Sequence, residues 1–118
     1  MSSFAAKVSH ERIKTSDLYA GALLLDVHCS ASNAAYMRCK ERHGDSDACQ
    51  AQAAAVSQCT LSFFDRLRGS KCGDRFAAYS NCLYNANNFE LAACSKFNAA
   101  LAQCIDANEP ALKQPQQQ

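Results

Sequence analysis

Residues 29–59 read CSASNAAYMRCKERHGDSDACQAQAAAVSQC, and residues 72–104 read CGDRFAAYSNCLYNANNFELAACSKFNAALAQC. Together these two stretches contain all eight cysteines of the 118-residue chain. Ten positions along an α-helix correspond to about 15 Å and leave both side chains on one side of the helix. The spacing therefore predicts four helices, each carrying two cysteines with nine residues between them: Cys29/Cys39, Cys49/Cys59, Cys72/Cys82 and Cys94/Cys104.

The same geometry predicts how the cysteines pair. A disulfide within one helix is excluded, because about 15 Å is far more than the roughly 7 Å between Cα atoms that a disulfide tolerates. Consecutive helices with a short connection pack antiparallel, and the breaker run HGDS at residues 43–46 supplies such a connection. Antiparallel packing joins inner cysteines to inner ones and outer to outer. The predicted disulfides are Cys29–Cys59, Cys39–Cys49, Cys72–Cys104 and Cys82–Cys94.

A second repeat indicates two copies of one unit. Seven positions after the first cysteine of each pair, on the same helix face, stand Tyr36, Val56, Tyr79 and Leu101. In each hairpin, a tyrosine therefore faces an aliphatic residue between the two predicted disulfides. The sequence predicts an all-α fold of two tandem disulfide-stapled antiparallel hairpins. The expected organisation is an N-terminal extension (1–16), an N-terminal helix (17–28), a first hairpin (29–69), a second hairpin (70–107) and a flexible tail (108–118).

Two apolar stretches lie outside the staples. The N-terminal helix contains Leu23, Leu24 and Leu25, and it can either cover the first hairpin or dock on a partner protein. Phe63 and Phe64 follow the outer cysteine of the first hairpin. These two rings either pack on the neighbouring hairpin, which we favour, or are exposed to a partner.

The composition restricts both stability and compartment. Hydrophobic residues make up 48% of the chain, but 22 of them are alanine, which buries little area. Disulfides are the usual remedy when a hairpin of this size lacks a large core, and they imply an oxidising compartment. Residues 1–16 lack the apolar core of a secretory signal, and the longest apolar run, 18–25, is too short to span a membrane. The mitochondrial intermembrane space is the compartment that we expect.

The chain lacks the patterns of several functional classes. Zinc motifs place cysteines two to four residues apart, and neither His28 nor His43 completes a ligand set. No Cys-x-x-Cys redox pair and no recognisable catalytic constellation is present. The net charge is +1 and no basic stripe stands out, which argues against nucleic acid as a partner. We therefore expect no catalytic residues, no metal and no cofactor.

With these motifs in place, the sequence resembles the coiled-coil-helix-coiled-coil-helix (CHCH) family, whose mark is the twin Cys-x9-Cys hairpin. The quadruple pattern resembles the accessory alpha-subcomplex subunit 8 family of mitochondrial respiratory complex I, NADH:ubiquinone oxidoreductase. The resemblance covers roughly residues 15–106. It is carried by the segment before the first hairpin (15–29), by NAAYMRCK at 33–40, by YSNCLY at 79–84 and by NFEL at 88–91.

The resemblance implies a non-catalytic structural and assembly role. Such subunits lie on the intermembrane-space side of the inner membrane, peripheral to it, and bind other complex I subunits, including core subunits of the membrane arm. They are imported reduced and are trapped when a resident thiol oxidoreductase forms their disulfides. The alternative is an intermembrane-space assembly factor or chaperone that does not stay in the mature complex.

The import step suggests a second use for the two tyrosines. A large apolar side chain three residues before a cysteine shares its helix face. Tyr36 before Cys39 and Tyr79 before Cys82 could therefore dock on the oxidoreductase while these cysteines form mixed disulfides. The simpler interpretation is that both tyrosines are core residues.

Overall fold

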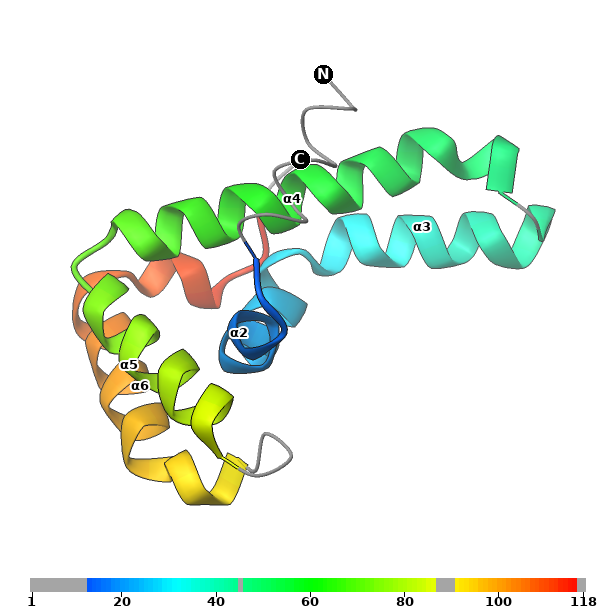
Figure 1. The fold of residues 1–118 in the computed structure, drawn as a ribbon. Helices are drawn as coiled ribbons and strands as arrows, with labels where there is room; N and C mark the ends of the chain where they lie inside the picture. Colours follow the sequence, from blue (N-terminus) through cyan, green and yellow to red (C-terminus); the bar gives the residue numbers. More distant parts are fainter. Residues whose placement is uncertain (1–12, 45, 87–90, 117–118) are drawn as a thin grey trace.

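The computed structural model describes residues 13–44, 46–86 and 91–116. Within these residues the secondary structure is entirely helical, which confirms the predicted all-α fold. The α-helices and short 3₁₀ turns, shown in chain order in Figure 1, are α2 (Thr15–His28), α3 (Ser30–His43), η1 (Ser46–Cys49), α4 (Gln50–Gly69), α5 (Gly73–Asn85), η3 (Leu91–Cys94), α6 (Ser95–Asn108) and η4 (Pro110–Lys113).

The helices α3 and α4 form one antiparallel hairpin, and α5 and α6 form a second (Figure 1). Two nested disulfides hold each hairpin: Cys29–Cys59 and Cys39–Cys49 in the first, Cys72–Cys104 and Cys82–Cys94 in the second. The paired Cα atoms are 5.7 to 5.9 Å apart, within the usual range for a disulfide. The predicted pair of tandem stapled hairpins is therefore present.

The helix α2 lies in the angle between the two hairpins, where Figure 1 shows it nearly end-on. It contacts α5 of the second hairpin and both helices of the first. Gly21 allows this close approach, because a Cβ atom at that position would lie 2.9 Å from Cε1 of the Phe64 ring. A larger residue at position 21 would push α2 away from the junction.

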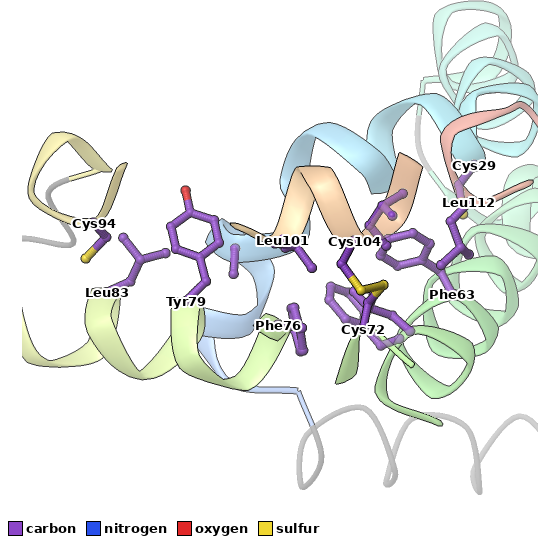
Figure 2. Close-up of a cluster of buried hydrophobic side chains, with 14 of the residues drawn as sticks. Cys29, Phe63, Cys72, Phe76, Tyr79, Leu83, Cys94, Leu101, Cys104 and Leu112 are labelled. Atoms are coloured by element: carbon purple, nitrogen blue, oxygen red, sulfur yellow. A yellow bond between two sulfur atoms is a disulfide. The ribbon is translucent and has the colours of Figure 1, made fainter. Parts of the chain in front are cut away.

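The core lies at this junction, where α2 and the bases of both hairpins meet. Phe63 and Phe64 contact each other edge to face with ring centroids 5.1 Å apart, and Phe64 lies 5.8 Å from Phe76 of α5. Around them pack further side chains of α4, α5, α6 and η4, several of which Figure 2 shows. The aromatic rings therefore join the first hairpin to the second.

The positions of Phe63 and Phe64 distinguish between the two alternatives that the sequence left open for these rings. The two side chains are only 1% and 0% exposed. They pack on the neighbouring hairpin, as we favoured, because the cysteine-free end of α4 continues past the outer staple into the angle between the hairpins. The partner-docking hypothesis is wrong for these two residues, since a partner cannot reach them in this fold.

The segment expected to be a flexible tail also differs from the prediction. Pro110–Lys113 forms the 3₁₀ turn η4, and Leu112 is fully buried in the core. Its polar composition suggested a tail without structure, but this one leucine provides an apolar anchor that the junction can cover. Residues 117–118, the N-terminal extension through residue 12, and residues 88–90 of the NFEL motif lie outside the described residues.

Candidate docking face and its supports

The helix α2 points four of its large apolar residues outward. Its buried residues are Ser16, Asp17, Ala20, Gly21 and His28. Its exposed residues include Leu18 at 42%, Tyr19 at 49%, Leu23 at 82% and Val27 at 42% exposure. A surface helix of a soluble protein normally shows the opposite arrangement, with apolar residues inward and polar ones outward. We call Leu18, Tyr19, Leu23 and Val27 the α2 docking face.

The spacing along the helix explains why these residues share one face. Tyr19, Leu23 and Val27 are four residues apart and so lie in one row, and Leu18 lies along the neighbouring row. Of the predicted docking leucines, Leu23 is exposed, whereas Leu24 and Leu25 are partly buried and pack against the core. The structure thus places one of the three leucines on the docking face and the other two in the supporting layer.

A buried polar cluster fixes the beginning of α2. One oxygen of the Asp17 carboxylate, Oδ2, accepts hydrogen bonds from the Arg68 side chain at 2.6 Å and from the Lys14 backbone N–H at 3.0 Å. The other oxygen, Oδ1, accepts a hydrogen bond from the Ser80 hydroxyl at 2.7 Å. Ser80 in turn lies 2.9 Å from the Ser16 hydroxyl. Because Arg68 belongs to α4 and Ser80 to α5, one carboxylate ties α2 to both hairpins.

His28 fixes the other end of α2. Its ring lies 5.7 Å from the Phe63 ring, and its Nδ1 is 3.0 Å from the Gln114 carbonyl oxygen. The backbone N–H of Gln116 donates to the His28 carbonyl oxygen at 2.8 Å. The C-terminal segment thus crosses the end of α2 beside the outer disulfide of the first hairpin. With both ends fixed, α2 holds its docking face in one orientation.

Sequence reasoning did not identify Asp17 or His28 as supports. Asp17 is the third helical residue, and its carboxylate reaches back to the backbone N–H of Lys14, the N-cap residue. Its pairing with Arg68 spans 51 positions of sequence, which no local pattern reveals. His28 stands next to a cysteine, a position that carries no signal for a contact with residue 114.

The two repeat-related tyrosines occupy different environments. Tyr79 is 4% exposed, and burial raises the pKa of its phenol. Tyr36 is only partly buried, and the Lys40 ammonium lies 5.7 Å from the centre of its ring. Their neighbours Cys39 and Cys82 are both in disulfides. Of these two tyrosines, Tyr36 alone is partly exposed to solvent in the folded protein.

Two further kinds of feature, a metal-binding cluster and a membrane-spanning helix, are absent from the described residues. No group of three or more His, Cys, Asp or Glu side chains in them is arranged to hold a metal ion. None of the helices described is both long and apolar enough to cross a membrane.

Comparisons with known proteins support the family. No family model and no solved structure matches the chain. A curated relative, NADH dehydrogenase [ubiquinone] 1 alpha subcomplex subunit 8-A of Arabidopsis thaliana, is 29% identical over 75 residues, which is 63% of this chain and 68% of the relative. Together with the four disulfides of twin Cys-x9-Cys type, this match confirms the predicted similarity of the chain to the alpha subcomplex subunit 8 family of NADH dehydrogenase.

Proposed function

We propose that this chain is a non-catalytic accessory subunit of mitochondrial complex I. Its similarity to an alpha subcomplex subunit of NADH dehydrogenase is the observation that carries the proposal. The proposed position is the intermembrane-space side of the membrane arm, peripheral to the inner membrane. The disulfide framework supports this position, because four disulfides suit an oxidising compartment such as the intermembrane space.

The α2 docking face is the surface that we assign to binding other complex I subunits, including membrane-arm core subunits. Leu23 is 82% exposed, and leaving such a side chain in water forgoes about 1.5–3 kcal/mol that burial would provide. Leu18 and Val27 extend the same apolar surface. Charged residues are depleted at the centre of protein interfaces, and Asp26 is the one charged residue on the exposed side of α2 between Leu18 and Val27.

The test of the function is blue-native electrophoresis of solubilised mitochondrial membranes, with complexome mass spectrometry following this chain. We expect the chain to migrate with active complex I at one copy per complex. Migration only as a small soluble species would contradict the subunit role and would favour an assembly factor or chaperone.

The test of the docking face uses matched aspartate variants. Leu23→Asp and Val27→Asp together should remove the chain from complex I, because association would bury two unpaired charges. Leu91→Asp is the control, since Leu91 is 52% exposed but lies in η3, away from α2. All variants should retain four disulfides, measured by thiol alkylation. Equal loss of association in the control would contradict the assignment of the face.

We also propose that Tyr36 and Tyr79 help the thiol oxidoreductase to engage Cys39 and Cys82 during import. Burial of Tyr79 in the folded state does not conflict with this role, since docking precedes folding. Tyr36→Ala and Tyr79→Ala should reduce the yield of the mixed disulfide with the oxidoreductase, whereas the phenylalanine variants should retain it. An unchanged yield in the alanine variants would rule the docking role out.

A further inference from the structure

Three surface hollows in the described part of the chain differ in charge. The hollow between α5 and α6 beside Cys82 is lined by neutral residues. The hollow beside the start of α2 contains Lys14 and Arg68, but Asp17 and Asp74 balance them. A third hollow contains two cations and no acidic residue. We call it the cationic hollow; its volume is about 580 Å³, and its lining consists of Lys71, Arg75, Ala100, Gln103, Cys104, Ala107 and Asn108.

The charge of the cationic hollow is not neutralised by the fold. Within the described residues, neither Lys71 nor Arg75 forms an ion pair. The nearby acids of the C-terminal segment have other partners: Lys113 pairs with Asp106, and Arg66 lies 3.9 Å from Glu109. Both side chains are exposed, and because they line one hollow, their like charges repel each other. An anion in the hollow would relieve it.

Other residues that line the cationic hollow contribute hydrogen-bond donors and apolar surface. Gln103 contributes amide N–H donors, whereas Asn108 donates from its amide to the carbonyl oxygen and to Sγ of Cys104, at 3.1 and 3.5 Å. Lysine, a compact charge, and arginine, a planar fork of donors, are the residues that proteins use for phosphate groups. The alanines and the Cys72–Cys104 disulfide supply apolar wall beside these donors.

We propose that the cationic hollow binds the phosphate group of an anionic ligand, either a free phosphate or the headgroup of a phospholipid. Lys71 and Arg75 hold the phosphate oxygens, and the amide of Gln103 completes the hydrogen bonding. The Cys72–Cys104 staple fixes the distance between the start of α5 and the end of α6 and so keeps the two sides of the hollow together. This site does not depend on the proposed role in complex I.

The test uses the full oxidised chain with two probes. Inorganic phosphate is titrated at constant ionic strength and followed by calorimetry. Vesicles of phosphatidylglycerol with phosphatidylcholine, and vesicles of phosphatidylcholine alone, are tested by flotation. The hollow variant is Lys71→Gln with Arg75→Gln. The control variant is Arg38→Gln with Arg42→Gln, two exposed cations of α3 with the same spacing and the same change in charge.

We expect the hollow variant to bind at least about tenfold more weakly, since charge-assisted hydrogen bonds are lost, and the control variant to bind like the unaltered chain. Saturable binding of inorganic phosphate would identify a general phosphate site, whereas binding of only the anionic vesicles would identify a lipid headgroup. Equal weakening in both variants would overturn the proposal, because it would show attraction by net charge alone. Absence of binding to both probes would also overturn it.

Discussion

The first hairpin, α3 with α4, and the second, α5 with α6, contain the same pair of nested disulfides but differ in what lies between them. In α3 only Ser32 and Cys39 are buried. In α5 the buried residues are Phe76, Tyr79, Ser80 and Leu83, and α6 adds Leu101 and Ile105. The second hairpin has a core along its length, whereas the first has one only at its base, where α4 continues past Cys59 into Phe63, Phe64 and Leu67.

The position of α2 accounts for this difference. It packs along α5 and against the base of the first hairpin, so no other described element forms a third layer on the outer half of α3 and α4. A two-helix arrangement rich in alanine buries little area. The Cys39–Cys49 disulfide, which lies outside the core cluster, therefore replaces packing at that end. The same arrangement of disulfides thus replaces a core in the outer half of the first hairpin and adds to a core in the second.

The largest expected effect comes from truncating the repeat-related aliphatic residues. Leu101 is 2% exposed, and Leu101→Ala should lower the free energy of unfolding by about 2–5 kcal/mol, since it leaves a cavity in the core. Val56 occupies the same repeat position but is only partly buried, so Val56→Ala should cost about 1 kcal/mol or less. Denaturant unfolding of the oxidised chains measures both values. Similar losses in the two variants would contradict the proposed difference between the hairpins.

The inner disulfides give the next test. Their sequence separations are 10 and 12, so the entropy of loop closure predicts nearly equal contributions of roughly 3 kcal/mol for each. Cys39→Ala with Cys49→Ala should abolish the protection of backbone amides in the outer half of α3 and α4. Cys82→Ala with Cys94→Ala should leave most of the protection in α5 and α6, because the buried side chains remain.

Hydrogen exchange followed by mass spectrometry resolves this difference by segment. The remaining three disulfides are verified by thiol alkylation in each variant. If both double variants lost protection to the same extent, packing would not distinguish the hairpins and the staples alone would hold both.

A smaller effect is expected at the joint between the hairpins. Asp17→Asn removes the charge that meets Arg68 and should cost about 1–3 kcal/mol, since a buried hydrogen-bonded pair is broken. The Asp17 side chain is 7% exposed, whereas that of Arg68 is 29% exposed, so part of the loss is compensated by water around the guanidinium. Asp26→Asn, an exposed change of the same kind on α2, should have little effect. Calorimetric unfolding of the two variants measures the difference.

The cysteine spacing predicted the helices and hairpins because a ten-residue separation has only one helical geometry, and short connections leave only the antiparallel arrangement. The spacing could not predict which of the two repeat-related tyrosines is buried. Tyr36 and Tyr79 have the same place in the pattern, yet only Tyr79 meets a third layer. That layer is α2, which packs along α5 and whose position depends on long-range contacts: its His28 meets Gln114 over 86 positions of sequence.

The docking face shows a similar limit. The sequence identified an apolar helix outside the staples, and Leu23 is indeed exposed. It could not tell Leu23 from Leu24 and Leu25, because α2 is apolar around most of its circumference and its pattern does not indicate an inner face. The inward side was decided by Gly21, which allows close contact with Phe64, and by Asp17, which finds Arg68 and Ser80.

The smallest expected effect concerns the tyrosines at alkaline pH. Burial raises the pKa of Tyr79 above its ordinary value of about 10. The folded state therefore keeps the phenol protonated at a pH at which the unfolded chain ionises it. The contribution to stability is complete below pH of about 10 and is lost as the pH rises toward the folded-state pKa.

Tyr79→Phe should make the free energy of unfolding fall less steeply between pH of about 9 and 11, because the phenylalanine has no proton to lose. The unaltered chain, unfolded over the same pH range, is the reference. With every cysteine in a disulfide, no thiol titrates in this range to obscure the comparison. If Tyr79→Phe left the slope unchanged, the phenol would not be shielded from water in the folded state, and the contrast between the two hairpins would fail at this residue.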